Sequence, residues 1–127
     1  MVDNNGGLIP ESDRDFLVEK EYTFQLIPEQ GSVHLILQNI PFSEKFNPRF
    51  ADILIMIPVG YPTAPLDMFW TFPEITLANG AAPETTEMRQ EFHGKNWQRW
   101  SRHGAWRPGV DNLRTFIKAM RKEIDGI

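Results

Sequence analysis

The pattern of hydrophobic and polar residues predicts a pair of strands early in the chain. Tyr22–Ile27 alternates apolar with polar side chains, as a half-buried strand does, and Val33–Leu37 is a second strand-like run. Pro28–Gly31 between them has the composition of a turn, so we expect the two strands to form a hairpin. The alternation places His34 on the outward side of this sheet, which indicates an incidental histidine.

Two later strands complete a predicted antiparallel meander. Phe50–Val59 is the most hydrophobic run, and its length, β-branched residues and terminal proline favour a central strand. The prolines of Ile40–Arg49 predict a loop before it. Gly60–Pro65 follows as a rigid, extended connection, because a residue before proline is pushed out of the helical region. Leu66–Phe72 is the fourth predicted strand.

The last part of the chain has the periodicity of an amphipathic helix. One stripe of Val110–Ile124 faces a core and consists of Leu113, Phe116, Ile117, Met120 and Ile124. Residues 73–91 lack periodicity and predict a long irregular loop. Residues 1–12 are expected to be flexible, with a short turn of helix starting near Ser12. We therefore predict one domain, residues 1–127, of the α+β class, in which a four-stranded antiparallel meander packs against a C-terminal helix.

Composition narrows the class of protein. The chain has 127 residues, of which 41% are hydrophobic, and a formal net charge of −4, as expected for a folded domain rather than a disordered segment. No apolar run is long enough to cross a membrane and no leader pattern opens the chain, so we expect a cytoplasmic protein with no membrane contact. The absence of cysteine excludes disulfides, cysteine-ligated zinc and a thiol nucleophile.

Aromatic and basic side chains are concentrated in one stretch, Phe92–Pro108 (FHGKNWQRWSRHGAWRP). It holds three of the four tryptophans and two of the three histidines, with four basic residues and no acidic one. A loop that concentrates such side chains is typical of a functional site carried by a scaffold. The residues concerned are Trp97, Trp100, Trp106, His93, His103, Lys95, Arg99, Arg102 and Arg107.

This stretch does not predict a metal site. His93 and His103 could act as ligands together with Glu87 or Glu91. The separation of ten residues between the two histidines fits no familiar zinc spacing. We therefore predict no metal ion and no other cofactor.

A nucleic-acid site is a remote alternative. Trp97 and Trp100, with the neighbouring basic residues, have the composition of a surface on which single-stranded bases stack. The net charge of −4 opposes a polyanionic partner. Trp106 and at least one of the other two tryptophans are explained more simply as core residues between sheet and helix.

Two motifs resemble the E2 (ubiquitin-conjugating, UBC-like) superfamily. The run Pro58–Ile75, PVGYPTAPLDMFWTFPEI, is similar to the tyrosine–proline turn between the third and fourth E2 strands, with Tyr61, Pro62 and Pro65 in the matching places. Trp106–Pro108, followed by an amphipathic helix, resembles the tryptophan-x-proline step before the E2 crossover helix. From about Tyr22 onward, the chain looks like the compact bacterial E2-like proteins found beside ubiquitin-like and E1-like genes. The resemblance implies a UBC-like fold.

The chain departs from a typical E2 at the catalytic position. A His-Pro-Asn triplet is missing, the N-terminal helix is short, and the two C-terminal helices are absent. The region that should hold the E2 cysteine is Glu91–Ala105, and it has none. In the family, that cysteine carries the tail of a ubiquitin-like protein as a thioester. Because this chain has no cysteine, the thioester role cannot be assigned to any of its residues.

Ser101 lies within this E2-like window. It is the only residue with a hydroxyl side chain between Thr86 and Thr115, and it would carry the tail as an oxyester. A serine needs a base to remove its proton, and His103, or else His93, is suited to that role. In an extended segment, Ser101 and His103 would point to the same side. Arg102, Lys95 or backbone amides would stabilise the developing oxyanion.

The resemblance implies partners as well as an activity. An E2-like carrier accepts a ubiquitin-like protein from an E1-like enzyme and passes it to an amine. The competing interpretation is a non-catalytic E2 variant, a binding module that scaffolds an E1-like or modifier partner. A third alternative is that Ser101 or Ala105 stands in place of a native cysteine.

Overall fold

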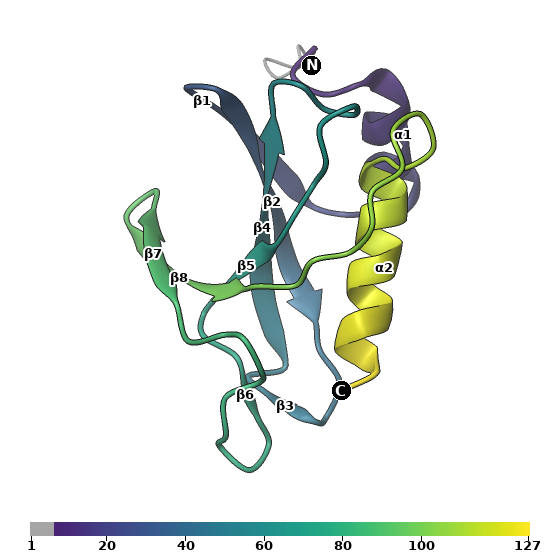
Figure 1. Ribbon diagram of the computed structural model, residues 1–127. Coiled ribbons are helices and arrows are strands. Elements are labelled where there is room, and N and C mark those ends of the chain that lie inside the picture. The colour runs from purple at the N-terminus through teal and green to yellow at the C-terminus, as the bar shows by residue number, and fades with distance from the viewer. Residues whose placement is uncertain (1–6) are drawn as a thin grey trace.

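A six-stranded antiparallel sheet is the centre of the computed structural model, which describes residues 7–127 (Figure 1). The strand order is β1-β2-β4-β5-β8-β7, and β3 and β6 pair in a small second sheet. None of the described helices is long and apolar enough to span a membrane. The elements are α1 (Glu11–Glu19), β1 (Phe24–Glu29), β2 (Ser32–Pro41), β3 (Phe46–Asn47), β4 (Phe50–Pro58), β5 (Phe69–Phe72), β6 (Thr76–Leu77), β7 (Arg89–Phe92), β8 (Lys95–Trp100) and α2 (Leu113–Asp125).

The predicted α+β class is confirmed, but the sheet is larger than predicted. The four predicted strands are present as β1, β2, β4 and β5 and are neighbours in that order. Two further strands, β8 and β7, extend the sheet beyond β5, so the expected four-stranded sheet is corrected to six. They come from the tryptophan-rich stretch and from the end of the predicted irregular loop. Sequence reasoning missed this hairpin because His93–Gly94 lacks the usual Asn-Gly turn signal.

Four local predictions also need correction. Gly60–Pro65 is not extended but forms a turn, in which the Ala64 N–H donates to Gly60 O at 2.8 Å. The predicted strand Leu66–Phe72 is regular only in β5. The predicted loop Ile40–Arg49 contains the end of β2 and all of β3. Residues 1–6 of the predicted flexible segment lie outside the described residues, while Ile9 is buried in the core and α1 is longer than the expected turn.

Both helices cover one face of the sheet (Figure 1). The predicted stripe of α2 is confirmed, with four of its five side chains buried and Phe116 half-buried. Burying an aliphatic side chain of this size stabilises a fold by about 1.5–3 kcal/mol, so the stripe is enough to hold α2 in place. Asn112 is the N-cap and forms a capping box with Thr115, whereas the neighbouring Asp111 binds Arg107.

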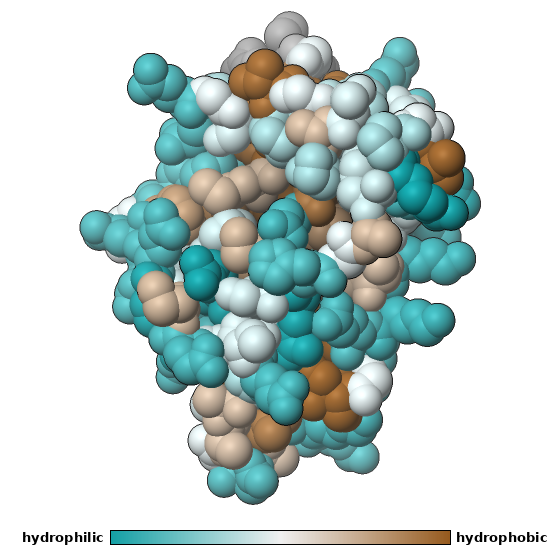
Figure 2. Space-filling view, viewed as in Figure 1, coloured by the Kyte–Doolittle hydropathy of each residue, from teal (hydrophilic) through white to brown (hydrophobic). Residues whose placement is uncertain are grey.

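The other face of the sheet carries a second, smaller core. Ile36, Leu54, Trp70 and Trp97 pack together there. The Phe92 ring, at the end of β7, contacts the Trp70 ring edge-on at a centroid distance of 5.6 Å. Burial on both faces explains why β4 is hydrophobic almost throughout. The outer surface is mostly hydrophilic in the view of Figure 2, with hydrophobic residues in scattered patches.

Tyr61 joins the two helices to the turn after β4. Its hydroxyl donates to Asp13 Oδ2 in α1 at 2.5 Å and accepts the Leu113 N–H at the start of α2, also at 2.5 Å. The two E2-like motifs also meet here, because Trp106 Nε1 donates to Pro62 O at 3.0 Å. Burial raises the pKa of the Asp13 carboxyl, while the Tyr61 hydrogen bond opposes that rise.

We predict that Tyr61→Phe destabilises the fold by about 1–3 kcal/mol, because it leaves a buried carboxylate and a helix N–H without their shared partner. The free energy of unfolding in urea measures the loss. Tyr22→Phe is the matched control, since it removes a hydroxyl from a half-buried ring that packs on Phe16. Equal losses in the two variants would contradict this role of Tyr61.

We also predict a pH-dependent contribution from Asp13. Because its folded-state pKa is raised, the folded protein holds this proton to a higher pH than the unfolded chain. The stabilisation that Asp13 contributes is fully present below its pKa in the unfolded chain, about 3.9, and is lost as the pH rises through its higher pKa in the folded protein. The difference in unfolding free energy between wild type and Asp13→Asn should therefore fall as the pH is raised from about 4. A difference that grows with pH would refute this assignment.

Candidate functional site

Buried hydrogen bonds fix the strand that leads into the candidate site. The Gln98 carboxamide accepts from Thr71 Oγ1 and from the Ile75 N–H, both at 2.8 Å, and donates to Ile75 O at 2.9 Å. Trp100 Nε1 donates to the same Thr71 hydroxyl at 2.9 Å, and its ring stacks on Phe69 at 5.3 Å between centroids. Because these side chains are fully buried, the end of β8 is held rigidly beside β5.

The segment 101–112 connects β8 to α2 without regular helix or strand. The Ser101 N–H donates to Thr85 O at 3.0 Å, and Arg102 O accepts from the Met68 N–H at 3.3 Å. Arg102 also reaches outward: its guanidinium contacts Glu123 Oε1 in α2 at 3.2 Å and Glu84 O at 3.0 Å. The segment is therefore tied to the sheet at its beginning and to α2 beside it.

Ser101 is half-buried and its hydroxyl has a cationic neighbour. Arg99 Nε donates to Ser101 Oγ at 3.0 Å. The hydroxyl is thus held by a guanidinium on the preceding strand rather than by one of the histidines predicted as its base.

His103 is exposed and pairs with a carboxylate that the sequence did not indicate. Its Nδ1 lies 2.7 Å from Asp67 Oδ1, with side-chain exposures of 63% and 44%. When Nδ1 carries the proton and donates it to Asp67, Nε2 is left as a free acceptor. The structure therefore brings His103 to Asp67 and not to Ser101. Asp67 was missed because 36 residues separate it from His103.

A cavity of about 110 Å³ lies beside this segment, between it and α2. It is lined mainly by apolar side chains of the loop, β5 and the helix, and its polar lining consists of Arg102, Asp111, Thr115 and Glu123. The apolar lining includes Leu66, Phe69, Ala105, Trp106, Phe116 and Met120.

The tryptophans of β8 do not form a stacking surface. Trp97 and Trp100 are 1% and 0% exposed and lie in the cores on opposite faces of the sheet. Trp106 is half-buried and packs against the main core, as predicted. Trp97 and Trp100 therefore do not support the nucleic-acid alternative, because buried rings cannot stack on bases.

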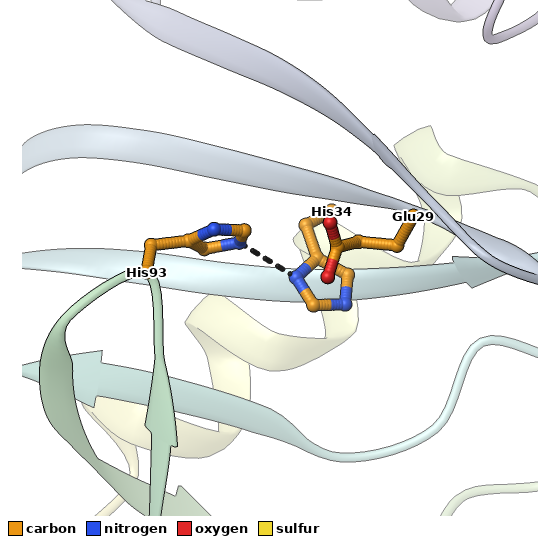
Figure 3. A group of neighbouring side chains, drawn as sticks. All are labelled: Glu29, His34 and His93. Atoms are coloured by element: carbon orange, nitrogen blue, oxygen red, sulfur yellow. Dashed lines mark hydrogen bonds between the residues drawn. The ribbon is translucent and has the colours of Figure 1, made fainter.

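The other two histidines, His34 and His93, contact each other at the tip of the β7–β8 hairpin, at the opposite end of β8 from Ser101 (Figure 3). His93 lies at the tip of β7–β8, and its Nε2 is 2.9 Å from Nδ1 of His34 in β2. His34 is only 3% exposed, so the prediction that it faces solvent is wrong. The β7–β8 hairpin covers His34, because the Phe92 and His93 rings both pack against its ring edge-on. Burial lowers the pKa of His34, the charge of His93 lowers it further, and Glu29 acts in the opposite direction.

An antiparallel meander, a tyrosine–proline turn and a tryptophan-x-proline step before a helix that crosses the sheet together define an E2-like domain. The sequence model of prokaryotic E2 family E matches residues 9–126. The chain therefore belongs to this family, which gives it an E2-like role in ubiquitin-like conjugation at the family level. Comparisons with curated proteins and with solved structures gave no match.

Proposed function

We propose that this protein is an E2-like carrier that accepts the C-terminal tail of a ubiquitin-like protein from an E1-like enzyme and passes it to an amine. Membership of prokaryotic E2 family E supports the E2-like role and, in general terms, both kinds of partner. The proposed carrier atom is Ser101 Oγ, with His103 as the base.

The proposed chemistry is an acyl exchange followed by an aminolysis. Ser101 Oγ attacks the carbonyl carbon of the tail thioester on the E1-like enzyme, and His103 Nε2 takes the hydroxyl proton. The C–S bond then breaks, and the departing thiolate receives that proton. In the second step an amine attacks the oxyester carbonyl and gives up a proton to His103, the C–O bond breaks, and the departing Ser101 oxygen receives that proton, which regenerates the hydroxyl.

The observation that carries this proposal is the Asp67–His103 hydrogen bond, 2.7 Å long, two residues from Ser101. A carboxylate on Nδ1 orients an imidazole so that Nε2 can accept a proton, which is the role of the acid in a serine–histidine–acid arrangement. Ser101 Oγ must leave Arg99 Nε to meet His103. Because the backbone of Ser101 and Arg102 is tied to Thr85 and Met68, this requires rotation of the Ser101 side chain and movement of the exposed His103 side chain. Arg99 would then remain beside the developing oxyanion. His93 has no part in this proposal, because it lies at the other end of β8.

The second candidate function is a non-catalytic E2 variant that scaffolds its partners. It is favoured by the Arg99–Ser101 hydrogen bond, because the hydroxyl there accepts from a guanidinium and contacts no base among the described residues that could take its proton. The two candidates differ in whether Ser101 forms a covalent adduct.

We predict that the protein, mixed with its E1-like and ubiquitin-like partners and ATP, forms an adduct that survives thiol reductant and is cleaved by hydroxylamine. Ser101→Ala should abolish the adduct and leave partner binding intact. Asp67→Asn should reduce the rate of its formation by about 10²-fold or more, because His103 loses its orienting carboxylate. Intact-mass analysis detects the adduct, and gel filtration detects the complex.

Ser43→Ala is the matched control, since Ser43 lies on a loop after β2, outside the segment 101–112. The carrier role of Ser101 is wrong if the adduct persists in Ser101→Ala or never forms with wild type. A stable complex without an adduct would support the scaffold. A cysteine at position 101 or 105 in the native gene would instead indicate a thioester.

We further propose that the exposed basic face of α2 contacts the E1-like enzyme, because the N-terminal helix that typical E2s use there is short in this chain. Arg114 and Lys118 both lie on this face. Lys118→Glu, and more strongly Lys118→Glu with Arg114→Glu, should weaken binding to the E1-like enzyme, and the loss should shrink as salt is added. Lys95→Glu is the control: it changes the net charge as much as Lys118→Glu does, but it lies at the β7–β8 tip and should leave this binding unchanged. Unchanged affinity in the double variant would exclude this surface.

A further inference from the structure

Three side chains from two separate hairpins converge on the sheet face opposite the helices. Glu29 ends β1, His34 lies in β2, and His93 occupies the tip of the β7–β8 hairpin (Figure 3). Their ligand atoms, one carboxylate oxygen and two ring nitrogens, all lie within 4.8 Å of one another. We propose that Glu29, His34 and His93 form a binding site for a divalent transition-metal ion such as Zn²⁺.

The two ring nitrogens are already close to the separation that a shared metal ion requires. His34 Nδ1 and His93 Nε2 are 2.9 Å apart. Two nitrogens at metal–nitrogen distances of about 2.05 Å are about 2.9 Å apart at a right-angled site and about 3.4 Å apart at a tetrahedral one. The separation of the two nitrogens therefore matches the first geometry and reaches the second by opening about 0.5 Å, with the rings turning so that both lone pairs point at the ion. Two imidazoles and one carboxylate are a donor set that zinc and related ions accept.

Packing places the His34 ring, and a tight turn places the His93 ring. The His34 ring is buried and contacts the Phe92 ring edge-on at a centroid distance of 5.2 Å. His93 and Gly94 both have positive φ, 53° and 78°, which is the backbone of a tight two-residue hairpin turn. That turn presents the His93 ring to His34. A preformed pair of ligands lowers the ordering cost of binding an ion.

Glu29 supplies the charge and the adaptable third ligand. It is exposed at the end of β1, next to the turn that connects β1 to β2, so its carboxylate can move the remaining distance toward the histidines. A carboxylate also offsets the charge of a divalent ion in a partly buried site. Because Glu29 and His93 are both exposed, an ion can enter from solvent and keep water on its open positions.

A bound ion would link the β1–β2 hairpin to the β7–β8 hairpin, which are not neighbours in the sheet. In the strand order, β4, β5 and β8 separate β2 from β7, and His34 and His93 are 59 residues apart in the chain. The site is independent of the proposed carrier function, because His93 precedes β8 whereas Ser101 follows it.

The test is a titration of tag-free, chelator-treated full-length protein with Zn²⁺ alone, followed by calorimetry. We expect one equivalent to bind and to raise the melting temperature. Loss of an outer-shell partner typically weakens metal binding by about 10–100-fold, so His93→Asn and Glu29→Gln, which each remove a direct ligand, should weaken it at least about tenfold. Asn tolerates the positive φ of position 93, so the turn is retained.

His103→Gln is the matched control, since it removes the third histidine of the chain, which lies outside the cluster. It should bind Zn²⁺ as wild type does. Co²⁺ provides a second readout, because its visible absorption reports nitrogen and oxygen ligation and should be lost in His93→Asn while the circular dichroism stays unchanged. The site is refuted if wild type binds Zn²⁺ no more tightly than His93→Asn, or if only His103→Gln loses binding.

Discussion

Tyr61 lies where three parts of the chain meet, and the arrangement around the candidate site depends on its hydroxyl. That one group donates to Asp13 in α1 and accepts from the first N–H of α2, while the adjacent Pro62 carbonyl receives the Trp106 indole. The start of α2, the turn after β4 and the end of the 101–112 segment are thereby placed in fixed relation. A buried hydroxyl that satisfies both a carboxylate and a helix N–H is difficult to replace, because its loss leaves both partners unpaired.

The strand β8 is anchored by buried side chains and contributes a tryptophan to the core on each face of the sheet. Its buried Gln98 and Trp100 hold it against β5, and its two tryptophans lie in different cores because residues three apart on a strand point to opposite faces. The concentration of aromatic residues that marked Phe92–Pro108 as functional is therefore largely structural. The side chains that we propose for chemistry flank β8: Ser101 and His103 follow the strand, and His93 precedes it.

The three histidines have three different environments, and none of these follows from the local sequence. His34 alternates with apolar residues as a surface residue would, yet the β7–β8 hairpin folds over it and buries it. His93 pairs with His34 rather than with the serine eight residues away. His103 pairs with Asp67, which lies two residues after Pro65 of the E2-like turn. In each case the partner is distant in sequence: the pairing of β5 with β8 brings Asp67 to His103, and the fold of the β7–β8 hairpin over β2 brings His93 to His34.

The sequence by itself determined the α+β class, the four strands of the meander, the buried stripe of α2 and the E2-like family, because these depend on periodicity, turn residues and local motifs. Burial of α2 could be predicted since residues at helical spacing share one face wherever the helix docks. Only the tertiary structure decided that β7 and β8 extend the sheet, that Asp67 meets His103, and that Glu29, His34 and His93 converge. Those contacts arise from strand order and hairpin curvature, which join residues 36 and 59 positions apart and leave no periodic trace in the chain.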